Sequence, residues 1–290
     1  MTWWTGAAIG FDTETDGPVP QDARIITGAL VYVSPGNAPV EMEQMIQPER
    51  DIPAEATAVH GITTGRAMAE GVLREVGVAQ IVATIAEIAS PDIPVVGHNA
   101  SYDLTLLDRE MRRLGIGFLE LDPGNSFVMM VGADGKVIGR QFPVIDTYVL
   151  DKAVDRYRPG KRKLEVTARH YGVPMAEGSA HGATADVIAS LRIAITIAKR
   201  CAMPISKVAD LYMDRRFPMK IAETYYNLGA MSLAELHCAQ VAWAAEQADG
   251  LREHFRQNPE KGVDPDDVSG DWPLRVLTED EMTETVSTTV

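Results

Sequence analysis

The stretch AAIGFDTET at residues 7–15 predicts a buried strand that carries polar groups at its end. Ala7 to Phe11 are apolar, and Asp12 and Glu14 follow them two residues apart. Because side chains two apart in a strand point to the same face, both carboxylates face one site. Two close carboxylates repel each other unless a cation lies between them, which favours a divalent metal site. A polar strand end that runs into the turn at 16–18 is the alternative.

A second motif, GHNASYDL at residues 97–104, follows a short predicted strand over 93–96. Ser101 is the expected N-cap of a helix over 101–114. Asp103 then lies in the first helical turn, near the place where the strand ends of the sheet converge. Its simpler role is to complement the helix dipole, which is worth at most about 1 kcal/mol.

The third motif is HGATAD at residues 181–186. His181 lies in a glycine-containing loop, and Asp186 lies inside a predicted helix over 183–200. A loop histidine is usually a solvated side chain, so this motif indicates a functional site only because the other two motifs are present.

Together the three motifs supply four carboxylates and one histidine, and two divalent cations would balance the formal charge of the carboxylates. Two metals about 4 Å apart stabilise both the attacking and the leaving oxygen in phosphoryl transfer. A histidine with an ordinary pKa near 6.5 can remove a proton from the attacking water at neutral pH. The residues therefore predict phosphodiester hydrolysis and leave substrate and polarity open.

The rest of the chain predicts an α/β fold with a mixed sheet covered by helices. Further strands are expected at 24–33, 40–47 and 144–146, and further helices at 75–89, 147–155 and 163–171. Three segments extend this domain: a hairpin insert at 125–141, a helical region at 201–258 and an acidic tail at 259–290. The hairpin could cover a substrate groove or contact a partner. The helical region, with a long helix over 232–255, is expected to pack on its own domain, and docking to a partner is the alternative. The tail is expected to be flexible.

The net charge of −14, from 27 basic and 41 acidic residues, at first argues against a nucleic-acid partner. Half of it lies in the acidic tail, however, and the four site carboxylates account for −4 more. Five basic residues lie within 156–163, which favours a loop that contacts phosphates. Replacing Arg158, Lys161 and Arg162 with Ala is expected to weaken substrate binding and to flatten its salt dependence.

Composition also limits the class of protein. The two cysteines cannot form a disulfide scaffold or a four-ligand zinc site. No apolar stretch approaches the roughly 18 residues of a membrane span, and no basic segment followed by an apolar run opens the sequence. A cytoplasmic protein without membrane contact is expected.

The motifs resemble those of the DEDDh branch of the DnaQ-like 3′–5′ exonucleases, a family that includes the epsilon proofreading subunit of bacterial DNA polymerase III. FDTET, HNASYDLTLL and HGATAD match the three family motifs in order and spacing over residues 5–200. The resemblance implies an RNase H-like five-stranded mixed sheet, with two Mg²⁺ or Mn²⁺ ions per site. It makes His181 the general base, and a histidine there indicates the h branch. The implied metal ligands are Asp12, Glu14, Asp103 and Asp186.

The resemblance also implies residues that contact the substrate. AVHGIT at 58–63 is similar to a family segment beside the terminal nucleotide, which makes His60 a candidate. Thr13, Thr15 and Asn99 are further candidates for contacts at the 3′ end. Asp16 stands where the family often has a second threonine and would add an acid near the metals. For Asp146, a structural role is expected rather than ligation.

The activity that the resemblance implies is release of nucleoside monophosphates from a single-stranded 3′ end. DNA is expected as the substrate in preference to RNA. A DNA polymerase or another replication or repair protein is the expected protein partner. Trimming of RNA is one alternative, and a non-catalytic module that docks on a polymerase is another.

Overall fold

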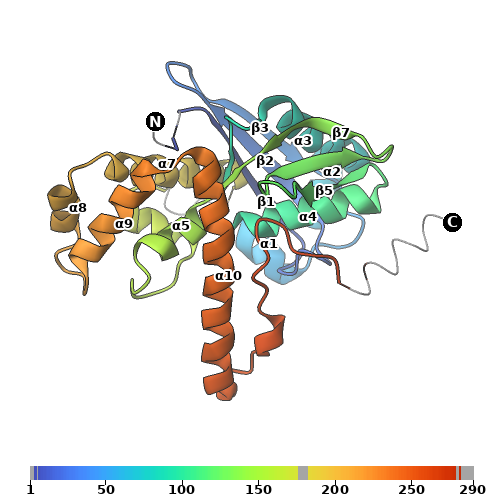
Figure 1. The fold of residues 1–290 in the computed structure, drawn as a ribbon. Coiled ribbons are helices and arrows are strands. Elements are labelled where there is room, and N and C mark those ends of the chain that lie inside the picture. Colours follow the sequence, from blue (N-terminus) through green and yellow to red (C-terminus); the bar gives the residue numbers. More distant parts are fainter. Residues whose placement is uncertain (1–2, 5, 176–181, 279–280, 282–290) are drawn as a thin grey trace.

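A mixed five-stranded sheet forms the centre of the computed structural model, which describes residues 3–4, 6–175, 182–278 and 281 (Figure 1). The strand order is β3-β2-β1-β4-β8, in which β2 and β3 are antiparallel neighbours and β4 and β8 run parallel to β1. This confirms the predicted sheet. The strands are β1 (Ala8–Thr15), β2 (Ile25–Val33), β3 (Val40–Met45), β4 (Val95–Gly97) and β8 (Val144–Asp146).

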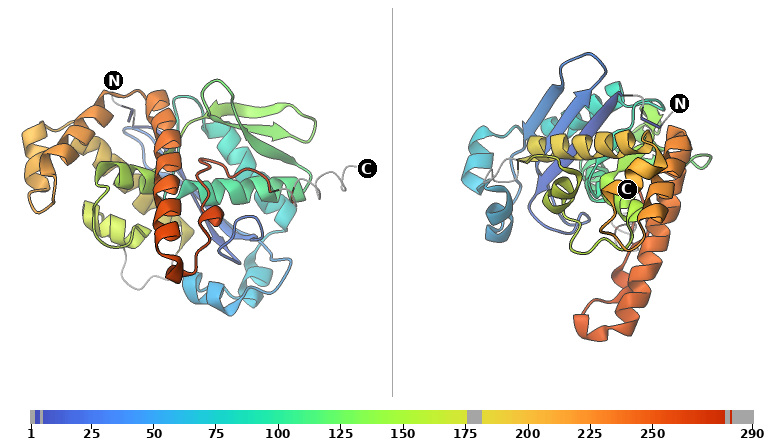
Figure 2. Two further views of the ribbon diagram at one scale, coloured as in Figure 1. Left: turned by 60° about the horizontal axis from the view of Figure 1, so that its bottom comes forward. Right: turned by 90° about the vertical axis from the view of Figure 1, so that its left-hand side faces the viewer.

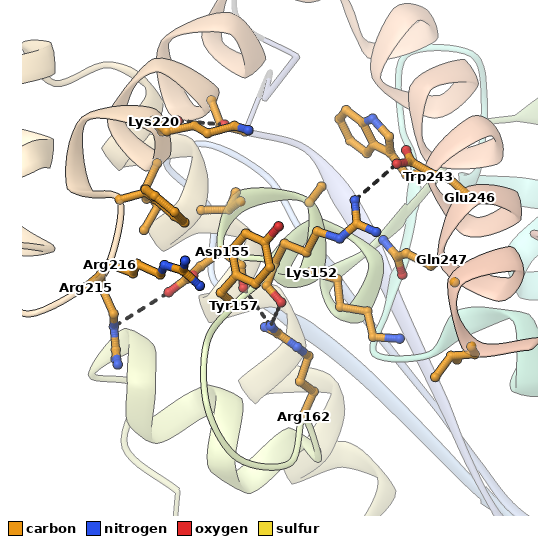
Figure 3. Close-up of a pocket in the computed structure, with 18 residues that line it drawn as sticks. Lys152, Asp155, Tyr157, Arg162, Arg215, Arg216, Lys220, Trp243, Glu246 and Gln247 are labelled. Carbon is orange, nitrogen blue, oxygen red and sulfur yellow. Dashed lines mark hydrogen bonds and ion pairs between the residues drawn. The ribbon is translucent and has the colours of Figure 1, made fainter. Parts of the chain in front are cut away.

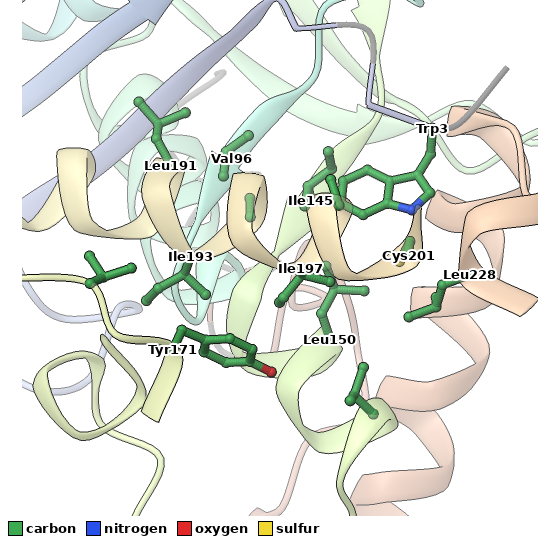
Figure 4. Close-up of a cluster of buried hydrophobic side chains, with 14 of the residues drawn as sticks. Trp3, Val96, Ile145, Leu150, Tyr171, Leu191, Ile193, Ile197, Cys201 and Leu228 are labelled. Atoms are coloured by element: carbon green, nitrogen blue, oxygen red, sulfur yellow. The ribbon is translucent and has the colours of Figure 1, made fainter. Parts of the chain in front are cut away.

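Different helices bury the two faces of this sheet. Helix α7 (Ala183–Cys201) crosses one face, where Leu191 and Ile197 pack with Val96 and Ile145 (Figures 2 and 4). Helices α3 (Arg74–Ile88) and α4 (Ala100–Arg113) cover the other face. Figure 4 shows the apolar side chains that α7 contributes to its core.

The alternation of side chains along β1 decides which face receives each polar group. Ala8 belongs to the core under α7, whereas Ile9 and Phe11 belong to the core under α3 and α4. Asp12 and Glu14 therefore share the α7 face, and Thr13 lies on the α4 face. Gly10 lets α7 come close, since a Cβ on this residue would lie 2.4 Å from Val187 and 3.0 Å from Leu191.

The predicted hairpin is present as β6 (Val128–Gly132) and β7 (Val137–Phe142), and β5 (Gly117–Leu121) extends it to three antiparallel strands. This small sheet packs on α3, where a Cβ on Gly139 would lie 2.4 Å from the Ala86 carbonyl oxygen. Its buried side chains join the core under α3 and α4. It therefore lies on the opposite side of the main sheet from α7.

The remaining helices come before and after α7 in the chain, and those after it form the C-terminal region. Those before α7 are α1 (Ala54–His60), α2 (Thr64–Glu70), α5 (Thr147–Val154) and α6 (Leu164–Tyr171). Those after it are α8 (Ile205–Leu211), α9 (Pro218–Ala230) and α10 (Leu233–Gln257), followed by two short 3₁₀ turns at Pro259–Lys261 and Pro265–Asp267.

Helix α10 closes the edge of the sheet at β8. It begins with the predicted capping box of Ser232 and Glu235. His237 Nδ1 accepts a hydrogen bond of 3.0 Å from the Val144 amide, and Gln240 Oε1 accepts one of 2.8 Å from the Asp146 amide. These side chains take the place of a further strand, so the start of α10 packs on its own domain as expected.

The expectation of a flexible acidic tail is wrong for part of residues 259–290. Trp272 is 4% exposed and donates from Nε1 to Asp146 at 3.1 Å. Leu274 joins the core beside α4, and the Arg275 amide donates to Thr105 Oγ1 at 3.0 Å. Burial of Trp272 and Leu274 stabilises this packing, although the net acidity of the whole tail predicts a solvated segment. In the part of the chain that the structure describes, no helix is long and apolar enough to cross a membrane.

Candidate active site

Three carboxylates meet where β1 passes under the first turn of α7. Asp12 and Glu14 come from the α7 face of β1, and Asp186 comes from α7 itself. One ligand oxygen from each residue lies within 4.8 Å of the others. Carboxylate oxygens are the ligands that Mg²⁺ and Mn²⁺ prefer, so these three residues could hold a divalent cation.

The fourth predicted carboxylate, Asp103, lies in the first turn of α4 and is buried. Its Oδ1 accepts hydrogen bonds from the Thr13 amide at 3.0 Å and from Thr13 Oγ1 at 2.6 Å. Thr13 thus positions Asp103 beside Asp12. The Thr13 hydroxyl therefore has a carboxylate partner within the protein, and contact of Thr13 with a substrate stays a prediction.

Burial and mutual repulsion raise the pKa values of this cluster. Burial, followed by the charges of Asp103, Asp186 and Glu14, raises the pKa of Asp12 well above its usual value. Burial, then Asp186 and Asp103, raises the pKa of Glu14 to about 8. Burial also raises the pKa of Asp103 to about 7 against its hydrogen bonds to Thr13. Near neutral pH the carboxyls retain protons that a divalent cation would displace, so the donor set fits such an ion.

Two other acids near the motifs have partners of their own. Asp16 accepts a hydrogen bond of 2.7 Å from the Arg24 amide and forms an ion pair of 2.5 Å with Arg50 Nε. Its charge is therefore neutralised by Arg50, contrary to the expectation that it adds an acid near the metals.

Asp146 binds the start of α4. It accepts from the amides of Asn99 at 2.9 Å and Ala100 at 3.0 Å, which supports the structural role expected for it. The N-cap is Asn99, with φ of +67°, and not the predicted Ser101. The sequence could not show this, because the capping carboxylate comes from another strand.

The segment that contains His60 lies against the end of β1. His60 is 4% exposed, and its Nδ1 accepts a hydrogen bond of 3.1 Å from the Ile62 amide. Burial lowers its pKa, and an interaction with the Thr15 backbone partly offsets this effect. Thr15 Oγ1 donates to the Gly17 carbonyl at 2.8 Å and lies 2.9 Å from the Tyr102 hydroxyl.

The basic run at 156–163 is held by a buried acid that the sequence did not reveal. Asp151 accepts hydrogen bonds from Arg158 Nη2 at 2.6 Å, from Arg162 and from the Tyr171 hydroxyl at 3.1 Å. Arg158 is only 7% exposed. The expectation that Arg158 and Arg162 contact phosphates is therefore wrong for their guanidinium groups, which are bound to Asp151. Lys161 is exposed.

The histidines of the second and third motifs differ in what the structure describes of them. His181 lies outside the described residues, and the described chain resumes at Gly182, the N-cap of α7. His98, which sequence analysis did not select, lies 2.8 Å from Thr147 Oγ1 through Nδ1 and 2.8 Å from the Arg162 carbonyl through Nε2. It joins the end of β4 to the basic run. Burial lowers its pKa, so it is neutral near pH 7.

Comparisons with known proteins identify the family of this chain. A sequence model of the exonuclease family (RNase_T) matches residues 9–194. A DNA polymerase III subunit epsilon-like protein of Rhodobacter capsulatus is 31% identical over 187 residues, which are 63% of this chain and 22% of that protein. An uncharacterised exonuclease of Escherichia phage 186 is 30% identical over 201 residues, which are 68% of this chain and 91% of that protein.

A solved structure of Exonuclease I from E. coli, in complex with a dT13 oligonucleotide, shares the fold. The TM-score is 0.50 at 19% identity, over 76% of this chain and 46% of that one. This chain thus spans less than a quarter of the Rhodobacter protein and less than half of Exonuclease I. The family match covers more than half of the chain and includes all four carboxylates, so the chain belongs to the exonuclease family, in its DnaQ-like 3′–5′ branch.

Proposed function

We propose that this chain hydrolyses phosphodiester bonds at the 3′ end of DNA and releases nucleoside monophosphates. The observation that carries the proposal is the convergence of Asp12, Glu14 and Asp186 within 4.8 Å, with Asp103 held beside them by Thr13. In this proposal the four carboxylates bind two Mg²⁺ or Mn²⁺ ions. When bound, the ions would stabilise negative charge on the attacking and leaving oxygens.

Each residue of the site has a defined task in this proposal. Asp12 and Glu14 present oxygens from a rigid strand, and Asp186 approaches them because Gly10 admits α7. His181, five residues before Asp186, accepts the proton of the attacking water. His60, Thr15 and Asn99 are proposed to contact the terminal nucleotide, since His60 lies against the Thr15 backbone and Asn99 begins the helix that carries Asp103.

DNA is proposed as the substrate because relatives carry the name of a DNA polymerase III subunit, including an epsilon subunit of Rickettsia typhi that is 30% identical over 196 residues. A polymerase or another replication or repair protein is the proposed protein partner for the same reason. The alternatives, trimming of RNA and a non-catalytic docking role, give different results in the following experiment.

The test is digestion of 5′-labelled single-stranded DNA, duplex DNA and RNA with Mg²⁺ or Mn²⁺. We expect a ladder of DNA fragments shortened from the 3′ end, and no ladder in EDTA. His181→Asn is expected to lower kcat by about 100-fold or more while leaving metal binding unchanged, because it removes only the proton acceptor. Digestion of RNA alone would favour the trimming role. Intact strands in every reaction would leave only the docking role.

A further inference from the structure

A basic cavity of about 560 Å³ lies outside the carboxylate site, between α5, the loop at 155–162, the start of α9 and the second half of α10 (Figure 3). Its lining has a net formal charge of +4 in a chain whose total is −14. Two acids line it, Asp155 and Glu246, against six basic residues: Lys152, Arg156, Arg162, Arg215, Arg216 and Lys220.

Three of these cations are already used within the protein. Arg162 binds Asp151, Arg215 lies 3.6 Å from Asp155, and Arg156 lies 3.3 Å from Glu246. The other three, Lys152, Arg216 and Lys220, form no ion pair with an acid in the described parts of the chain. Lys152 and Arg216 only lie over aromatic rings, 4.3 Å from Tyr148 and 4.9 Å from Phe217. These three can pair with an external anion.

Exposed aromatic rings lie beside these cations. Tyr157 and Phe217 are 60% and 40% exposed, and their ring centroids are 5.8 Å apart. Figure 3 shows Tyr157 between Arg216 on one side and Lys152 on the other. The 13-residue helix α9 begins at this wall with no side-chain cap, so its positive end adds to the field. Cations together with exposed rings are the combination that binds phosphates and stacked bases.

A smaller hollow of about 150 Å³ adjoins the cavity and is lined in part by residues of the second motif. The two share Lys152, Gln247 and Leu251 in their lining. The smaller hollow is also lined by Asn99 and Ser101, which lie within four residues of Asp103. The four site carboxylates line neither hollow, so the smaller one extends the basic cavity only as far as the second motif. A chain of linked phosphates could span both hollows, whereas a single free nucleotide would occupy only one of them.

We infer that the basic cavity binds nucleotides of the substrate strand upstream of its 3′ end. Bases stack on Tyr157 and Phe217, and phosphates pair with Lys152, Arg216 and Lys220. The inference rests on the proposed function and adds to it a strand path through residues of the C-terminal helices, which lie beyond the 9–194 family match. A free mononucleotide carries the same phosphate and base, and it is the alternative ligand of the basic cavity that the test distinguishes.

The test measures binding without hydrolysis, by fluorescence anisotropy of 5′-labelled oligo-dT on the full chain in EDTA. The Arg216→Ala/Lys220→Ala double variant is compared with Lys207→Ala, which removes an exposed cation of α8 that lines neither hollow. We expect the double variant to bind a strand of about 12 nucleotides about tenfold more weakly, and to bind a trinucleotide as the wild type does. The log–log salt slope should fall by about 0.7 for each phosphate that the variant no longer binds.

The following outcomes would overturn the inference: equal weakening for the long strand and the trinucleotide, or no weakening for either. Tight binding of dTMP that the double variant loses, with the 12-nucleotide strand unaffected, would assign the cavity to a free nucleotide. If polyglutamate displaced the labelled strand as effectively as an unlabelled strand does, the cavity would be a site for acidic proteins. Because the test requires no hydrolysis, a chain that binds in this way but digests nothing would refute the proposed function, while strand binding by the basic cavity would stand.

Discussion

Glu14→Gln is expected to lower exonuclease activity by more than about 100-fold. Loss of a residue that only supports a metal ligand typically lowers activity by about 10–100-fold, and Glu14 is itself a proposed ligand. The substitution keeps the shape of the side chain but removes one of three carboxylates whose oxygens lie within 4.8 Å. The rate of digestion of 5′-labelled single-stranded DNA at saturating Mg²⁺ measures the effect.

The same substitution is expected to stabilise the metal-free protein. The folded pKa of Glu14 is raised from 4.5 to about 8, so the folded state binds the extra proton between these values. Stability of the wild type in EDTA therefore falls as pH rises from 4.5 through 8, and Gln removes this contribution. Melting in EDTA should show a higher Tm for the variant than for the wild type, with a larger difference at pH 8 than at pH 6.

The matched control is Glu120→Gln, an exposed strand residue of the small sheet. It should change neither activity nor the pH dependence of Tm. An active Glu14→Gln enzyme, or one that melts below the wild type in EDTA at pH 8, would show that the carboxylates do not form the repelling cluster described above.

Asp151→Asn is expected to destabilise the fold by about 3–5 kcal/mol, because it leaves buried Arg158 and Arg162 without their counter-ion. Hydrogen bonds and charges from these arginines hold the pKa of Asp151 below its usual value despite burial. The stabilisation is therefore present above pH 3.8 and is lost as pH falls towards the lower folded pKa. Urea unfolding measures the difference, which should narrow below pH 3.8.

Lys161→Ala is the control for the basic run, since Lys161 is exposed, and its effect should stay within about 0.5 kcal/mol. The sequence predicted that Arg158 and Lys161 act together on substrate, whereas the structure separates them. Wild-type stability in Asp151→Asn would mean that the arginines do not depend on this acid.

The central sheet was predictable because its signals are local. The apolar run before Asp12, the short run at 144–146 and the helical spacing in 183–200 each identify an element within a few residues of its observed bounds. The convergence of the acids was also predictable, because parallel strands end at one edge of a sheet and side chains alternate along β1.

The features that could not be predicted depend on contacts between distant segments. Thr13 binds Asp103 across 90 residues, and Gln240 of α10 binds β8 across 94. The buried state of Asp151 depends on Arg158 folding back over it, so a solvated run and a buried ion pair have the same local sequence. Helices α1 and α2 have only seven residues each, too few for a periodic pattern.

The most direct measurement of the proposed metal site is the number of Mn²⁺ ions bound per chain, titrated by electron paramagnetic resonance at pH 8 and pH 6. We expect two ions per wild-type chain, with weaker binding at pH 6, where the raised pKa values of Glu14 and Asp103 keep protons on the site. Asp12→Asn is expected to abolish this binding. Absence of bound Mn²⁺ at pH 8, or binding that Asp12→Asn leaves unchanged, would contradict a carboxylate site for divalent ions.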